Sequence, residues 1–114
     1  MTIFARVATA LDTLSPAVEY GMGTYLGEDG ALPDYYLVYQ LISGVPGQHA
    51  DDEEKERNYR IQVTHWKRSG LEDLADVDAA MKAAGGVKSG EHPLARDNDT
   101  GHFGLAVDYI FQET

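Results

Sequence analysis

The segment Asp34–Ser43 constrains the fold most, because large apolar side chains occupy both of its alternating faces. Its odd-numbered positions carry Tyr, Leu, Tyr and Leu, and its even-numbered positions include Tyr, Val and Ile. Such a strand is covered on both faces, or is covered on one face and contacts a neighbour on the other. The segment 57–66 alternates cleanly instead, as a half-buried strand does. Together they predict two long strands in a layered domain.

A helix and a short strand are predicted before these two segments. Apolar residues at steps of three and four predict an amphipathic helix over residues 1–14, which Ser15–Pro16 ends. Residues 17–26 are rich in β-branched and aromatic side chains, but Gly21 and Gly23 interrupt them. We therefore expect a short or bulged strand there.

A second helix and a last strand are predicted after residue 66. Ser69 and Glu72 fit a capping box, and the apolar stripe that follows predicts a helix ending at Gly85–Gly86. Residues 87–100 are predicted to be a loop. Apolar and small or polar residues then alternate from Phe103 to Gln112, which predicts a strand.

The fold class follows from this order of elements. With residues 44–56 as a second long polar loop, the order is helix, strand, strand, strand, helix, strand. Two amphipathic helices can pack on one face of a mainly antiparallel four-stranded sheet, which gives an α+β fold. No repeat or long linker divides the chain, so we expect a single domain over residues 1–114.

The charge balance narrows the possible partners. The net charge is −10, which argues against duplex-DNA binding and against docking on anionic lipid. No cysteine is present, so disulfides and thiolate chemistry are excluded. We expect neither a secretory signal nor a membrane-spanning segment, because no sufficiently long apolar run is present.

No motif predicts catalysis, a cofactor site or a metal site. His49 could meet Asp51 and Asp52 at a metal ion, but solvated loop residues are the favoured interpretation. His65 lies on the apolar face of its strand, where a core or interface histidine is expected. The segment that starts at Asp97 lacks the glycine and the terminal glutamate of an EF-hand calcium loop. We therefore predict that the chain is not an enzyme.

The tyrosines suggest a binding surface. Two helices cannot cover both faces of the predicted sheet, so some aromatic surface is expected to remain open to a partner. The alternative is that tyrosines simply tolerate a half-wet sheet face. The tyrosines on predicted strands are Tyr35, Tyr36, Tyr39, Tyr59 and Tyr109.

Four segments, in this order along the chain, resemble a known family. Leu32–Ser43 is a proline-led aromatic strand, and Asn58–Ser69 contains Arg-x-Gln-Val-x-x-Trp and ends in Ser. An acidic helix follows, and Asp108–Phe111 closes the chain. This arrangement resembles the tail terminators, which are also called tail-completion or head–tail joining proteins, of long-tailed phages and prophages.

The resemblance implies a structural role in the virion, assembled in the host cytoplasm. Such proteins form a hexameric ring that caps the tail tube and then joins it to the head-completion (connector) proteins. The implied partners are further copies of the chain, the major tail tube protein and the connector, while DNA passes through without specific binding and no membrane takes part. Interface residues expected for this role are Asp51, Asp52, Glu53, Glu54, Arg57, Tyr36 and Trp66.

Two other functions remain open at this point. An acidic chain can mimic DNA and inhibit a nucleic-acid-binding enzyme, although the acids here cluster in one loop and one helix. A small ligand-binding or enzymatic α+β domain is the third interpretation, and the missing site motifs disfavour it.

Overall fold

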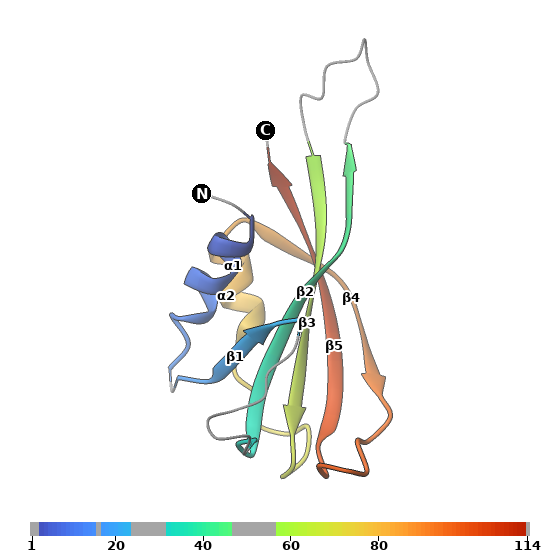
Figure 1. The fold of residues 1–114 in the computed structure, drawn as a ribbon. Coiled ribbons are helices and arrows are strands. Elements are labelled where there is room, and N and C mark those ends of the chain that lie inside the picture. Colours follow the sequence, from blue (N-terminus) through green and yellow to red (C-terminus); the bar gives the residue numbers. More distant parts are fainter. Residues whose placement is uncertain (1–2, 16, 24–31, 47–56, 114) are drawn as a thin grey trace.

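The computed structural model describes residues 3–15, 17–23, 32–46 and 57–113. Within these residues it has two helices and a five-stranded sheet of order β1-β2-β3-β5-β4 (Figure 1). Strand β1 runs parallel to β2, and the other neighbouring pairs are antiparallel. The elements in chain order are α1 (Ile3–Leu11), β1 (Glu19–Met22), β2 (Tyr35–Pro46), β3 (Arg57–Lys67), α2 (Val77–Ala83), β4 (Gly86–Leu94) and β5 (Phe103–Glu113).

The α+β class with two helices is confirmed, but the predicted four-stranded sheet is wrong. Strand β4 occupies much of the segment that was predicted to be the loop 87–100, and it pairs with β5 at the edge of the sheet. The segment contains polar residues together with Gly90 and Pro93, a composition that is typical of a loop. An edge strand tolerates this composition as well. The pairing register shifts between Lys88 and Gly90, which marks a bulge.

Helix α1 forms where the periodicity predicts it. Its buried residues recur at helical spacing and face the sheet, and they are Ile3, Val7, Ala10 and Leu11. The helix ends before the predicted boundary, and the hydroxyl of Thr13 donates to the carbonyl of Ala10 at 2.6 Å. This bond satisfies one of the carbonyls that a helix end leaves free.

The predicted start of the second helix is wrong. Helix α2 begins at Val77, and its N-cap is Asp76, whose carboxylate accepts from the amide of Ala79 at 3.1 Å. The hydroxyl of Ser69 instead donates to the carboxylate of Asp34 at 2.9 Å, which ties the turn after β3 to the start of β2. The capping-box pattern therefore serves a contact between distant parts of the chain.

The predicted loop 44–56 is wrong at its beginning. Residues 44–46 continue β2, whose last residue Pro46 lies opposite Arg57 of β3. Residues 47–56, which include the acidic run, lie outside the described residues. The β2–β3 pair extends past both helices (Figure 1), and the molecule measures 50 × 26 × 26 Å.

The main core lies between the sheet and the two helices. Leu37 on β2, Ile61 and Val63 on β3 and Phe111 on β5 are fully buried there. Four of the five strand tyrosines also belong to this side, namely Tyr35, Tyr39, Tyr59 and Tyr109. The predicted tyrosine-rich open face is therefore wrong, because only Tyr36 among these five points away from the helices. Neither described helix is both long and apolar enough to cross a membrane.

Candidate functional site

The predicted interface residues fall into separate places. The acidic run 51–54 lies outside the described residues, and Arg57 is placed only through its backbone, as the first residue of β3. Tyr36 and Trp66 are direct cross-strand partners on β2 and β3. The structure therefore brings these two aromatic residues together, on the face of the sheet away from the helices.

Tyr36 is packed inside the chain and does not present a free aromatic face. Only 7% of it is exposed, and its ring meets the ring of His102 edge-on at 5.0 Å between centroids. Burial raises the pKa of the Tyr36 hydroxyl above its ordinary value. The ring of His102 is fully buried and lies with its Nε2 2.8 Å from the carbonyl of Pro33. A carbonyl only accepts, so Nε2 carries a proton and donates.

Trp66 is half-buried and lies over the strand beside it. A Cβ built on Gly104 would come within 2.6 Å of the Trp66 ring. The indole therefore covers the backbone of β5 at a position where a side chain has no room. Trp66 retains some exposed surface, so its predicted role at an interface stays a prediction.

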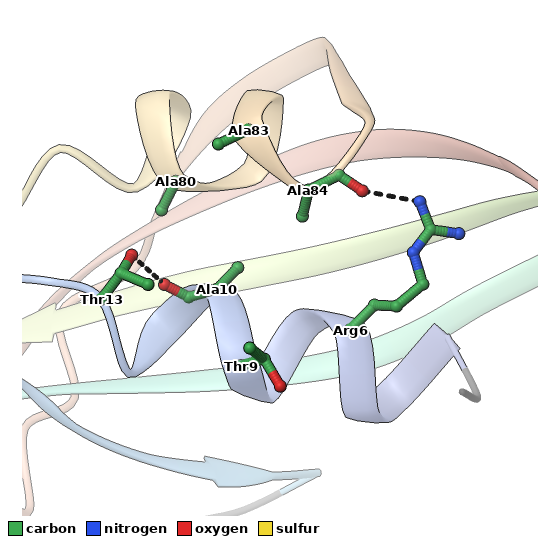
Figure 2. Close-up of a pocket in the computed structure, with 7 residues that line it drawn as sticks. All are labelled: Arg6, Thr9, Ala10, Thr13, Ala80, Ala83 and Ala84. Atoms are coloured by element: carbon green, nitrogen blue, oxygen red, sulfur yellow. Dashed lines mark hydrogen bonds between the residues drawn. The ribbon is translucent and has the colours of Figure 1, made fainter.

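An apolar groove of about 290 Å³ separates the two helices (Figure 2). The guanidinium of Arg6 closes one end by donating to the carbonyl of Ala84 at 2.6 Å, and it also lies 5.5 Å from the ring centre of Phe111. The other lining residues are mostly small, namely Thr9, Ala10, Thr13, Ala80 and Ala83. Arg6 therefore joins α1 to the C-terminal end of α2.

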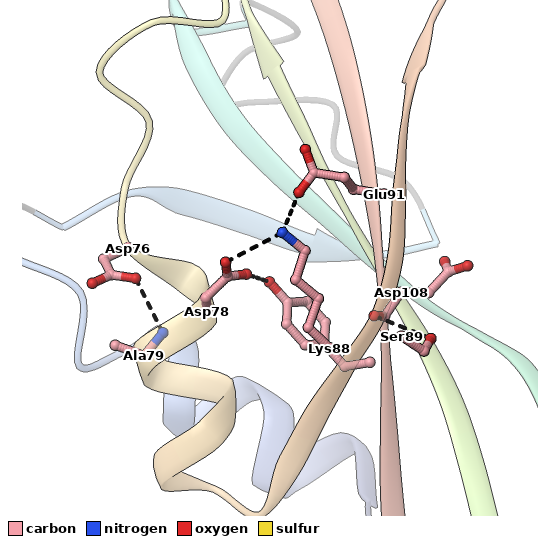
Figure 3. Close-up of polar contacts among 8 residues, drawn as sticks. Asp76, Asp78, Ala79, Lys88, Ser89, Glu91 and Asp108 are labelled. Atoms are coloured by element: carbon pink, nitrogen blue, oxygen red, sulfur yellow. Dashed lines mark hydrogen bonds and ion pairs between the residues drawn. The ribbon is translucent and has the colours of Figure 1, made fainter.

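A polar cluster joins α2 to the edge strand β4 and to its neighbour β5 (Figure 3). Asp78 accepts from the hydroxyl of Tyr109 and lies 3.5 Å from the Lys88 ammonium, which also binds Glu91. Burial, and then the bond to Asp78, raise the pKa of the Tyr109 hydroxyl. Each charged group of this cluster has a partner, so the arrangement fastens α2 to β4 and β5.

His65 lies beside this cluster, at a cavity of about 230 Å³. It is 4% exposed, which confirms a core position. The hydroxyl of Tyr35 accepts from the amide of Ala75 at 3.0 Å and forms a second hydrogen bond, of 2.6 Å, with Nδ1 of His65. Burial lowers the pKa of His65 to about 4, although Asp78 and Glu91 act in the opposite direction. The imidazole is therefore neutral at pH 7 and is held by the tyrosine.

The face away from the helices also carries a polar ladder across three strands. The side-chain amide of Gln40 donates to Gln62 at 3.1 Å, and that of Gln62 donates to Asp108 at 3.1 Å. In the part of the chain that the structure describes, no three His, Asp or Glu side chains gather in a way that could hold a metal ion. The sequence analysis missed this ladder, because the register that places Gln40, Gln62 and Asp108 side by side is not visible in the sequence.

Exposed apolar residues provide the other candidate surface. Val87 on β4 is 69% exposed, and Met22 at the end of β1 is 58% exposed. Sequence reasoning missed Val87 and Leu94 because their segment was predicted to be a loop. No family model matches this sequence, and no curated protein matches it. The function of these surfaces has to be inferred from their own residues.

Proposed function

We propose that this chain is a structural assembly protein without catalytic activity, which forms a ring at the head-proximal end of the tail tube of a long-tailed phage. One contrast carries the proposal. Large apolar side chains are exposed on the outer strands, whereas the ionisable side chains around the His65 cavity bind one another. Exposed apolar surface of this kind favours contacts with protein.

The resemblance to tail terminators gives this general role its specific form. The first two segments that carry the resemblance form β2 and β3, which pair along their whole described length. The C-terminal segment lies in β5, on the other side of β3. Three of the four resembling segments are therefore neighbours in one sheet.

The charge of the chain is compatible with this role. A ring of subunits that each carry −10 would repel the phosphates of DNA, so DNA could pass through its opening without being held. Further copies of the chain, the tail tube protein and the head-completion protein are the proposed partners.

The experiment is complementation of a phage that lacks this protein, with tail lengths measured by electron microscopy. Without the protein we expect tails of irregular, extended length that fail to join heads, and the wild-type chain should restore both properties. Tails of normal length that join heads in its absence would overturn the proposal.

The net charge of −10 also favours a second function, inhibition of a DNA-binding enzyme by mimicry of DNA. Purified protein would then compete with duplex DNA for a basic nuclease or polymerase, and the competition would weaken as salt rises. Competition together with normal tails would favour this second function over the first.

A further inference from the structure

Five of the six exposed large apolar side chains of the described residues lie on the two outer sides of the sheet, and the sixth is Phe103 of β5. On one side, Leu41 and Ile42 of β2 are 40% and 46% exposed, close to Met22 at the end of β1. On the other side, Val87 and Leu94 of β4 are 69% and 37% exposed. These two sides lie at opposite ends of the strand order (Figure 1). The chain thus has two separate apolar edges.

Both edges also have backbone groups with no strand beside them in the described residues, although β4 carries a bulge between Lys88 and Gly90 and has no N–H at Pro93. Strand β1 pairs with β2 only over Tyr36–Tyr39, and among the described residues no strand pairs with the outer side of β2 from Gln40 to Pro46. The outer side of β4 has no neighbouring strand within the same residues. Exposed edges usually carry charged residues that prevent pairing, but β2 contains none from Tyr35 to Pro46.

The two edges differ in charge. The segments 12–23 and 32–46, which form the β1–β2 side, contain three carboxylates and no lysine or arginine. The segment 82–96, which contains β4, has three cations and one carboxylate. The cations are Lys82 on α2, Lys88, which already pairs with Asp78 and Glu91, and Arg96 after β4. In a chain of net charge −10, this complementarity favours contact between the two different edges over contact between two identical ones.

We propose that the outer edge of β2 from Gln40 to Pro46 in one copy pairs with β4 of the next copy, so that one sheet continues between copies of this chain. A dimer made through two different edges still has one free β2 edge and one free β4 edge, so further copies can add. The assembly closes into a ring if the rotation between neighbouring copies allows it. The inference rests on the proposed function for its ring, but the contact itself can be tested without any phage component.

The absence of cysteine makes a direct test possible. Ile42→Cys and Val87→Cys place one thiol on each edge, and a short bis-maleimide then links edges that meet. The double variant should give a ladder of dimers, trimers and larger species on a denaturing gel. Each single variant should stay monomeric, and a 1:1 mixture of the two should stop at the dimer.

A matched control keeps one edge thiol and moves the other. Thr9 is exposed on α1, away from both strand edges, so Thr9→Cys with Val87→Cys should give no ladder. Leu41→Cys with Leu94→Cys provides a second edge pair if the first variant melts below the wild type. Both pairs replace side chains that are already exposed.

Three results would overturn the inference. Dimers from Ile42→Cys alone, without larger species from the double variant, would show pairing between identical β2 edges. No linked species from either edge pair, in folded protein at millimolar concentration, would show that the edges do not meet. A ladder as strong from the control pair would show random collision. If the ladder forms but phage tails are normal without the protein, the contact stands and the phage function fails.

Discussion

The cross-strand partners Leu41 and Ile61 lie opposite each other on β2 and β3, yet their surroundings differ. Ile61 is fully buried against the helices, whereas Leu41 is 40% exposed. The interior created by the two helices therefore excludes Leu41 on β2, although it continues past Ile61 to Tyr59 and its cross-strand partner Phe111. On β2 the exposed side chains of Leu41 and Ile42 need some other surface to cover them. The following changes test this contrast between the helix-covered interior and the outer sheet.

The largest effect on stability is expected from shortening the buried side chain of Ile61. Ile61→Ala should lower the free energy of unfolding by about 2–5 kcal/mol, because it removes packing and leaves a cavity. Leu41→Ala should cost less than about 1 kcal/mol, since much of that side chain already meets water. Urea unfolding of both variants measures the two values. Equal losses would show that Leu41 also belongs to the interior.

A pH effect of about 3 kcal/mol is expected from His65. Its pKa is about 4 in the folded chain, below the ordinary value of 6.5, so the unfolded chain binds the proton more readily. Its contribution to stability is complete above pH 6.5 and is lost as the pH falls from there to about 4. Urea unfolding between pH 4 and 7 measures it against the His65→Gln variant, which should show a flatter profile.

His92 is exposed on β4 and provides a control substitution. His92→Gln should change the free energy of unfolding at pH 7 by less than about 0.5 kcal/mol, as is usual at the surface. A wild-type profile that already matches that of His65→Gln would contradict a neutral, buried His65.

On the face away from the helices, adding a methyl group beneath Trp66 should lower the free energy of unfolding by about 1–3 kcal/mol. A methyl group at Gly104 would lie 2.6 Å from the Trp66 ring, so Gly104→Ala must displace the indole. Gly90→Ala is the matched control, since nothing lies within 4 Å of its added carbon. Trp66 is the single tryptophan, so its fluorescence reports the displacement directly. An unchanged spectrum in Gly104→Ala would contradict this packing.

A loss of about 1 kcal/mol is expected from the N-cap of α2. Asp76→Ala removes the carboxylate that accepts from the amide of Ala79. Ser69→Ala, at the cap suggested by the sequence, should cost less because it removes only an exposed bond to Asp34. The melting temperatures of the two variants measure this difference. A larger loss in Ser69→Ala would instead support the helix start at Ser69 that the sequence predicts.

The smallest effect on stability is expected from the acidic run. Replacing Asp51, Asp52, Glu53 and Glu54 by their amides should change the free energy of unfolding by less than about 0.5 kcal/mol, as is usual for surface substitutions. It should instead change tube capping or head joining in a salt-dependent manner, because exposed charges are screened within about 8 Å at physiological salt. Normal virions at every salt concentration would show that the run takes no part in assembly.

Strand β2 was predictable from its continuous run of apolar side chains, and β3 and β5 from an alternation that reflects one buried face. Strand β4 was not, because its polar residues and Gly90 carry no such alternation, and only the pairing with β5 makes it a strand. The start of α2 was mispredicted because a local capping pattern competes with a distant partner, Asp34, which the sequence does not reveal.

The candidate surfaces were predictable in part. The core position of His65 followed from its place on an apolar face, but its bond to Tyr35 depends on register. The tyrosines were assigned to strands correctly, while their faces depended on where two helices pack. The edge position of Val87 needed the strand order, which no local pattern encodes.

The length of the β2–β3 pair has a hydrodynamic consequence. The radius of gyration is 15.1 Å, whereas a compact chain of this length would have about 13 Å. A monomer of this shape diffuses more slowly than a sphere of the same mass, so it elutes early from a gel-filtration column. Elution volume alone would therefore assign too large a mass to a single subunit, and sedimentation equilibrium, which is independent of shape, is the measurement that counts subunits correctly.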